Sequence, residues 1–250
     1  MTEPLLRAEA ISVRFGGFSA VSDMSLAVAP GAIHALIGPN GAGKTTFFNA
    51  VTGARPPDDG KVVFDGRDVT RLPAHRRVAH GMARSFQVTN IFPNLTVAEN
   101  IRLAVQGRMG HEGWTFWRAA DSRRDVVSQV EAALETVRLT DRAAKRAGSL
   151  SHGAQRLLEI GMALGAKPTF ICLDEPLAGM SIDDIQRTKE LILALKERMG
   201  VLLIEHNMNV VLSISDCVTV MAQGRKIAEG APADIRNDPA VRSAYLGSKA

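Results

Sequence analysis

The fold class of this chain is decided by Gly38-Pro39-Asn40-Gly41-Ala42-Gly43-Lys44-Thr45, a stretch that fits the pattern G-x-x-x-x-G-K-[ST]. It lies between an apolar run at Ile33 to Ile37 and a helical pattern that continues to Thr52. Glycines in such a loop let successive backbone N–H groups turn toward phosphates, and the following helix adds the positive end of its dipole. The stretch therefore predicts a nucleoside triphosphate site, where Lys44 reaches the β- and γ-phosphates and Thr45 holds Mg²⁺.

A second chemical motif follows an apolar run in the last third of the chain. Asp174 and Glu175 come directly after Phe170 to Leu173, which reads as a buried strand. Ligands of α/β sheets gather at the carboxyl ends of the strands. We expect Asp174 to hold Mg²⁺, directly or through water, and Glu175 to act as general base on the attacking water. Adjacent acids after a strand can also cap a helix, but beside the phosphate loop they indicate a hydrolase.

The order of the remaining patterns predicts a single α/β domain of residues 1–250. Short apolar runs separated by turn signals predict several strands within residues 1–66, and helical spacing occupies residues 97–166. Strand and helix then alternate from Thr169 onward. We expect residues 1–96 and 167–250 to form the catalytic core with a β subdomain. Residues 97–166 would form a helical subdomain, with residues 107–124 as an insertion.

Composition excludes several classes of protein. The 250 residues are 46% hydrophobic and 22% charged, as is typical of a globular chain. The net charge of +4 comes without the dense basic clusters of a nucleic-acid-binding protein. The sequence contains neither a run of about 18 apolar residues nor a signal-peptide pattern. Cys172 and Cys217 lie in separate apolar runs without metal-ligand spacing, so we expect two buried, inert thiols in a cytosolic protein.

A third motif lies between the first two, just ahead of an amphipathic helical pattern. Leu150-Ser151-His152-Gly153-Ala154-Gln155 resembles the signature motif of the ATP-binding-cassette (ABC) ATPases. Other marks of that family occur in the expected order: Phe15, Ser85-Phe86-Gln87, the turn Gly179 to Ser181, and His206. The resemblance covers essentially the whole chain. It implies a P-loop cassette with a RecA-like core, an antiparallel β subdomain and a helical subdomain.

The resemblance also implies a role for individual residues. Phe15 would stack on adenine, a role for which the family more often uses tyrosine. Gln87 would contact Mg²⁺ and the attacking water, and it would sense the membrane partner. His206 would contact the γ-phosphate and help to align Glu175.

The remaining implied contacts cross between subunits. Ser151 and Gly153 would donate hydrogen bonds to the γ-phosphate of ATP held by a second ATPase subunit, so two subunits would close around two nucleotides. The implied cofactors are ATP and Mg²⁺. The predicted nucleotide-binding residues are Phe15, Gly38, Pro39, Asn40, Gly41, Ala42, Gly43, Lys44, Thr45, Thr46, Ser151 and Gly153. The predicted metal ligands are Thr45, Gln87 and Asp174, and the predicted catalytic residues are Glu175, His206 and Gln87.

Departures from the family pattern point to one subfamily. His152 and Ala154 replace the usual glycine and glutamine of the signature, and Ser181 stands where many members carry aspartate. A bulky residue at the first departure resembles the ATPases of importers for branched-chain amino acids and their relatives for urea and short-chain amides. Further features similar to that group are Arg14-Phe15-Gly16-Gly17, Arg84-Ser85-Phe86-Gln87, Asp174-Glu175-Pro176-Leu177-Ala178-Gly179-Met180 and Ala244-Tyr245-Leu246-Gly247.

The resemblance thus implies the ATP-hydrolysing subunit of an ABC importer, peripheral at the cytoplasmic face of a bacterial inner membrane. Its expected partners are a separate permease, a second ATPase subunit that is an identical copy or a sister, and indirectly a periplasmic binding protein; no nucleic acid is expected. We expect residues 88–95 and 107–124 to meet the permease, the latter through Trp114, Phe116 and Trp117. The tryptophan spacing also suits a helix packed on the chain's own helical subdomain.

Three rival functions stay open at this point. The ATPase of a lipopolysaccharide exporter is similar in size and in its Tyr-Leu-Gly tail, but it lacks the 107–124 segment and the Ser-Phe-Gln form. A soluble ABC ATPase acting on nucleic acid or ribosomes usually carries two cassettes or a long coiled-coil insert, and neither is visible. A cassette that binds nucleotide without hydrolysing it is disfavoured, because Lys44, Asp174, Glu175 and His206 are all present.

Overall fold

A computed structural model describes residues 3–85, 90–108 and 124–246 of the chain. Within these residues the strands form two sheets. One is antiparallel, with strand order β2-β1-β4-β5, and the other is mixed, with order β10-β9-β3-β8-β7-β6. All neighbours in the mixed sheet are parallel except β9 and β10. This architecture confirms the predicted α/β class.

The strands of the antiparallel sheet are β1 (Leu6–Phe15), β2 (Phe18–Val28), β4 (Asp59–Phe64) and β5 (Arg67–Asp68). Those of the mixed sheet are β3 (Ile33–Ile37), β6 (Met82–Arg84), β7 (Phe170–Asp174), β8 (Gly200–Ile204), β9 (Cys217–Ala222) and β10 (Arg225–Gly230). The helices are α1 (Lys44–Thr52), α2 (Ala74–Ala79), α3 (Val97–Arg108), α4 (Arg124–Thr136), α5 (His152–Gly165), α6 (Ile182–Lys196), α7 (Met208–Ile214), α8 (Pro232–Asn237) and α9 (Pro239–Leu246), with short 3₁₀ turns at Thr140–Arg142 and Ala147–Ser149.

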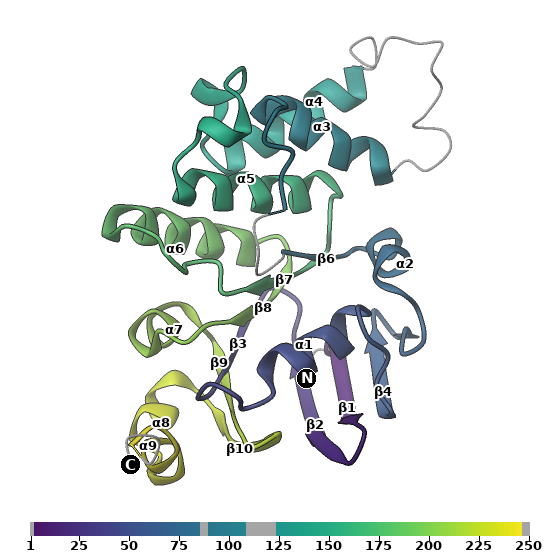
Figure 1. The fold of residues 1–250 in the computed structure, drawn as a ribbon, viewed down its shortest axis with the longest axis vertical. Helices are drawn as coiled ribbons and strands as arrows, with labels where there is room; N and C mark the ends of the chain where they lie inside the picture. The colour runs from purple at the N-terminus through teal and green to yellow at the C-terminus, as the bar shows by residue number, and fades with distance from the viewer. Residues whose placement is uncertain (1–2, 86–89, 109–123, 247–250) are drawn as a thin grey trace.

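The mixed sheet is covered on both faces, which explains why its central strands are continuous apolar runs. Along β7, Phe170 and Cys172 join the core shared with α1 and the antiparallel sheet, whereas Ile171 and Leu173 join the core shared with α5 and α6. This alternation is the period of two that a strand imposes. Figure 1 shows the antiparallel sheet on one side of the mixed sheet and the helices α3, α4 and α5 on the other.

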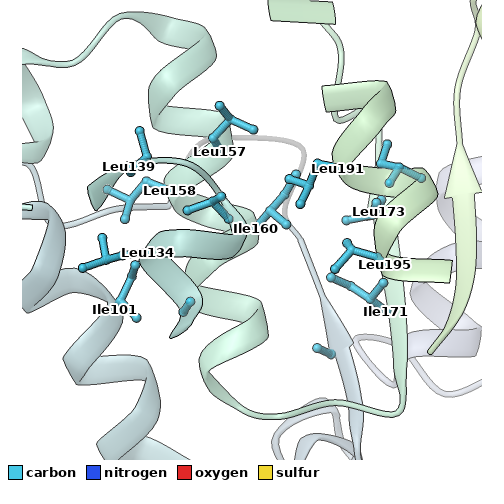
Figure 2. Close-up of a cluster of buried hydrophobic side chains, with 14 of the residues drawn as sticks. Ile101, Leu134, Leu139, Leu157, Leu158, Ile160, Ile171, Leu173, Leu191 and Leu195 are labelled. Carbon is cyan, nitrogen blue, oxygen red and sulfur yellow. The ribbon is translucent and has the colours of Figure 1, made fainter. Parts of the chain in front are cut away.

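One apolar cluster joins the helical part of the chain to the mixed sheet. Figure 2 shows it running from Ile101 on α3 and Leu134 on α4, through Leu158 on α5, to Leu191 on α6 and Leu173 on β7. All five side chains are less than a tenth exposed. The end of β7 and the helix α5 therefore share one closely packed core.

Several elements differ from the sequence-based expectation. β2 begins at Phe18, because Gly16 and Gly17 form a tight hairpin turn directly after β1 that the sequence analysis did not single out. The polar edge strand β10 lacks the apolar pattern by which strands are recognised. Cys172 is buried as expected, but Cys217 is only half-buried because it starts β9 at the end of the sheet, so that expectation was wrong.

Two further expectations concern the helical part and the membrane. Most of the predicted insertion, including Trp114, Phe116 and Trp117, lies outside the described residues, and its contacts stay a prediction. Among the helices that the structure describes, none combines the length and the apolarity that crossing a bilayer requires.

Candidate active site

The phosphate loop connects β3 to α1 and is pressed between neighbouring backbones. Gly38 and Gly43 have φ angles of +153° and +95°. A Cβ at Gly38 would overlap the Met221 carbonyl oxygen on β9, and one at Gly43 would overlap the Ala20 carbonyl oxygen on β2. These two positions need glycine for both space and backbone conformation, whereas a Cβ at Gly41 would meet nothing within 4 Å. The backbone of the loop therefore packs against β9 and β2, and it has free space at Gly41.

Lys44 is buried at the start of α1 with its ammonium turned into the loop. Nζ donates hydrogen bonds to the carbonyl oxygens of Gly38, at 2.7 Å, and Pro39, at 3.0 Å. Burial lowers the pKa of Lys44, and the nearby Glu175 and Asp174 carboxylates oppose that shift. The loop thus holds a cation at its centre, where phosphate oxygens would replace the two carbonyl acceptors.

A pocket of about 470 Å³ opens over this loop and gathers residues from three separate parts of the chain. Glu175 comes from the end of β7, and an aromatic pair comes from the hairpin between β1 and β2. The residues that line it are Phe15, Phe18, Ala20, Asn40, Gly41, Ala42, Gly43, Lys44, Thr45, Thr46 and Glu175. The predicted residues Gly38 and Pro39 lie behind this lining, where their carbonyl groups hold Lys44.

The aromatic wall of the pocket contains one residue that we predicted and one that we missed. Phe15 and Phe18 are paired across the hairpin and are 49% and 67% exposed. The guanidinium of Arg55 lies 4.2 Å from the Phe15 ring centroid and donates a hydrogen bond to the Arg14 carbonyl at 2.8 Å. Arg55 is not among the residues that line the pocket in the described part of the chain. The Gly16-Gly17 hairpin signal could have revealed Phe18.

Asp174 ends β7 as a buried carboxylate with an unsatisfied oxygen. Within the described residues no group donates a hydrogen bond to its Oδ1. Burial, and then the charge of Glu175, raises the pKa of Asp174 to about 6. A buried carboxylate oxygen without a donor is a fitting ligand for a divalent cation. The described residues contain no cluster of three or more His, Cys, Asp or Glu side chains around one point, so the predicted set of Thr45, Gln87 and Asp174, with phosphate oxygens and water, stays a prediction for Mg²⁺.

Glu175 and His206 approach each other at the ends of neighbouring strands. His206 Nδ1 lies 3.9 Å from Glu175 Oε1 and 3.9 Å from Glu205 Oε2. Glu175 has a φ of +47°, and its backbone N–H donates to the Ile204 carbonyl at 2.9 Å. The structure therefore brings together the two residues that the family resemblance implied as partners, and it adds Glu205, which the sequence analysis did not identify.

Gln87 lies outside the described residues, and its predicted role stays a prediction. The residue two positions before it is described. Ser85 donates its backbone N–H to the Cys172 carbonyl at 2.8 Å, and its Oγ accepts the Asp174 N–H at 3.1 Å. The chain that leads to Gln87 is therefore fixed against the end of β7, beside Asp174.

The signature residues lie apart from this pocket. Ser151 caps α5 by accepting the Ala154 N–H at 3.4 Å, and Gly153 is buried against the carboxylate of Asp184. The His152 ring packs against Gly179, where an added Cβ would lie 3.4 Å from it. Neither Ser151 nor Gly153 lines the pocket, and Figure 1 shows α5 in the helical part, away from α1. In the described part of the chain, the phosphate pocket has no signature residue of its own.

Comparisons with known proteins agree with this geometry. Residues 21–178 match the family model described as ABC transporter, and residues 225–250 match the model described as branched-chain amino acid ATP-binding cassette transporter. The high-affinity branched-chain amino acid transport ATP-binding protein BraF of Pseudomonas aeruginosa is 38% identical, over 99% of each chain. LivG of Escherichia coli, which bears the same description, is 37% identical, again over 99% of each chain.

Two further matches bear on the fold and on a rival function. The crystal structure of the ADP conformation of MJ1267, an ATP-binding cassette of an ABC transporter, superposes with a TM-score of 0.87 at 31% identity, covering 98% of this chain and 100% of that one. The lipopolysaccharide export system ATP-binding protein LptB of Haemophilus influenzae is 35% identical over 98% of each chain. The predicted cassette fold is thereby confirmed.

Proposed function

The chain belongs to the ABC transporter family of ATPases, and on that premise we propose that it powers the uptake of branched-chain amino acids, or of related small amides, through a separate membrane permease. The observation that carries the hydrolytic part is the single pocket that unites the phosphate loop, Phe15 and Glu175. The match of residues 225–250 to the branched-chain amino acid model, with the BraF and LivG relatives, supports the substrate class.

The proposed mechanism rests on positioning and charge, since phosphoryl transfer requires little covalent chemistry from the protein. Bound ATP with Mg²⁺ supplies the transferable phosphoryl group and the ion that neutralises its charge. Lys44 would exchange its two carbonyl acceptors for phosphate oxygens, and Thr45 and Asp174 would hold the ion. Glu175 would orient the attacking water and accept its proton, while His206, 3.9 Å away, would keep that carboxylate in place.

The separation of the signature residues from the pocket supports a site completed by a second ATPase subunit. Ser151 and Gly153 of one subunit would face the phosphate loop of the other. Ser181, which precedes the 86%-exposed Ile182, caps α6 by accepting the Asp184 N–H at 3.3 Å, so an exposed apolar side chain stands beside a fixed turn. We propose that this surface belongs to the interface between the two subunits, whether identical or sister chains.

The permease would contact the chain next to its Mg²⁺ site. Phe92 is 52% exposed, and it lies a few residues after Gln87 in the chain. Asn100 on α3 fixes this stretch by accepting the Phe92 N–H at 2.8 Å and donating to the Phe92 carbonyl at 3.0 Å. An exposed aromatic side chain on a fixed backbone is a suitable anchor for a partner at the cytoplasmic membrane face.

Uptake measurements in the native host test this proposal. Deleting the gene should abolish high-affinity uptake of radiolabelled leucine, and a plasmid copy of the wild type should restore it. Glu175→Gln at equal cellular level should not restore uptake, and membrane fractionation should recover both proteins with the inner membrane. Normal uptake in the deletion strain contradicts the importer function, and accumulation of lipopolysaccharide at the inner membrane would assign the chain to the exporter function instead.

A further inference from the structure

Glu205 is a buried acid that the mechanism above does not use. It follows the last residue of β8 and is only 1% exposed. Burial raises the pKa of Glu205, while hydrogen bonds from two backbone N–H groups oppose that shift. Removing a carboxylate from water is costly unless its oxygens are satisfied. A buried acid next to His206 therefore points to a task for its two oxygens.

One oxygen of Glu205 holds the turn after β7, and the other accepts from the next residue of its own loop. Oε1 accepts the Leu177 N–H at 3.0 Å, and Oε2 accepts the His206 N–H at 3.2 Å. Leu177 is two residues beyond Glu175, and it is itself buried. One carboxylate thus joins the turn that carries the proposed general base to the backbone of the histidine that faces it.

The turn after β7 has few other attachments to β8. Its own bonds are local: Ala178 N–H donates to the Glu175 carbonyl at 3.2 Å, and Met180 N–H donates to the Leu177 carbonyl at 3.3 Å. Among the described hydrogen bonds, the turn reaches the end of β8 through the Glu175 N–H and the Leu177 N–H. The first of these bonds joins two backbone groups, whereas the Leu177 bond depends on the side chain of Glu205.

We propose that Glu205 is a positioning residue, which sets the distance between Glu175 and His206 by holding the turn after Glu175 to the loop that carries His206. The inference rests on the proposed ATPase function and adds a residue to it. A carboxylate suits the task because both oxygens accept hydrogen bonds. A glutamine has the same shape but one acceptor, so its amide N–H₂ would face a backbone N–H. Aspartate keeps two acceptors on a shorter side chain.

The test compares Glu205→Gln and Glu205→Asp with wild type in ATP turnover by the full chain and in binding of a fluorescent ATP analogue. Small misplacements of catalytic groups are costly, so we expect Glu205→Gln to lower kcat about 10- to 100-fold. The KM and the analogue affinity should stay within about twofold, since the phosphate loop is untouched. Glu205→Asp should recover part of kcat. Amide exchange at Leu177 should be faster in Glu205→Gln than in wild type.

Asp216→Asn is the matched control, because Asp216 also joins two segments away from the pocket. It accepts the Ile33 N–H at 2.8 Å and pairs with Lys196. We expect this variant to lower the melting temperature while leaving kcat within about twofold. An unchanged kcat in Glu205→Gln, a loss of affinity instead of kcat, or an equal loss of kcat in Asp216→Asn overturns the proposal.

Glu175→Gln separates this proposal from the proposed function. If Glu175→Gln is inactive and Glu205→Gln has the activity of wild type, hydrolysis at this site stands and the positioning role fails. If wild type and Glu175→Gln do not differ in turnover, the hydrolytic function itself fails. Glu205→Asp keeps the test decisive should Glu205→Gln fold poorly, because it retains both acceptor oxygens.

Discussion

The phosphate loop and the acidic turn are the two halves of one site, and they are held in different ways. Lys44 is fixed by carbonyl groups five and six residues earlier in the chain. The turn after Glu175 is instead fixed by Glu205, whose bond to Leu177 spans 28 residues. One half is organised by a continuous stretch of sequence, whereas the other exists only when β7 and β8 lie side by side.

This difference teaches where each half is vulnerable. A change in the phosphate loop alters groups that touch phosphate, so it should act on binding. A change at the acidic turn alters groups that act on the attacking water, so it should act on turnover. The buried Asp174 lies between these two halves. Its carboxylate should lower the stability of the nucleotide-free protein, and the same carboxylate should be useful once Mg²⁺ and nucleotide are bound.

The largest expected effect contrasts the two halves directly. Glu175→Gln should lower turnover by about 10² to 10⁴, the usual contribution of a positioned general base, while nucleotide affinity persists. Lys44→Ala should instead raise the Kd for ATP about 10- to 100-fold, because charge-assisted hydrogen bonds contribute about 1.5–3 kcal/mol. Steady-state ATPase rates and titration with a fluorescent nucleotide measure both. Wild-type turnover in Glu175→Gln would remove Glu175 as the base.

A smaller effect is expected in stability at Asp174. Its folded pKa of about 6 exceeds the ordinary value near 3.8, so the folded state binds the proton more tightly and the free energy of unfolding falls as pH rises through this window. The full cost of about 3 kcal/mol applies above pH 6 and vanishes below about pH 4. Asp174→Asn should therefore be more stable than wild type at pH 8 without nucleotide, by about 1–3 kcal/mol, while losing hydrolysis.

Urea unfolding at pH 8 and at pH 4 measures that gain and its loss. Glu131→Gln, which removes an exposed carboxylate on α4, is the control and should change stability by less than about 0.5 kcal/mol. If Asp174→Asn is instead less stable than wild type at pH 8, the carboxylate is already compensated in the free protein and does not await a cation.

The smallest expected effect concerns the aromatic wall. Arg55→Ala removes the cation that lies over the Phe15 ring, an exposed interaction of about 0.5–1 kcal/mol. The ring should then move more freely, and the Kd for ATP should rise about two- to fivefold with kcat unchanged. Arg236→Ala, an exposed arginine on α8, should leave both constants at their wild-type values. Equal nucleotide affinity in Arg55→Ala and wild type would show that Phe15 is held by the hairpin alone.

The sequence predicted the parts of the site whose chemistry is carried by adjacent residues. Gly38 to Thr45, and the pair Asp174 and Glu175, were identified from short patterns in the right context. Phe18 and Arg55 were missed because neither belongs to a short motif: Phe18 is paired with Phe15 across the hairpin, and Arg55 contacts Phe15 from a segment far away in the chain. Glu205 was missed because an acid after an apolar run has no pattern that reveals which backbone groups it accepts.

By itself the sequence determined the α/β class, the phosphate loop and the family, because glycine spacing and strand-end acids are local requirements of phosphate chemistry. Only the tertiary structure decided that Glu175 shares a pocket with Phe15, and that Glu205 joins Leu177 to His206. It also decided that Ser151 and Gly153 stand away from that pocket. The physical reason is that these relations depend on strand order: β7, β8 and β3 are neighbours in the sheet, although they are separated along the chain.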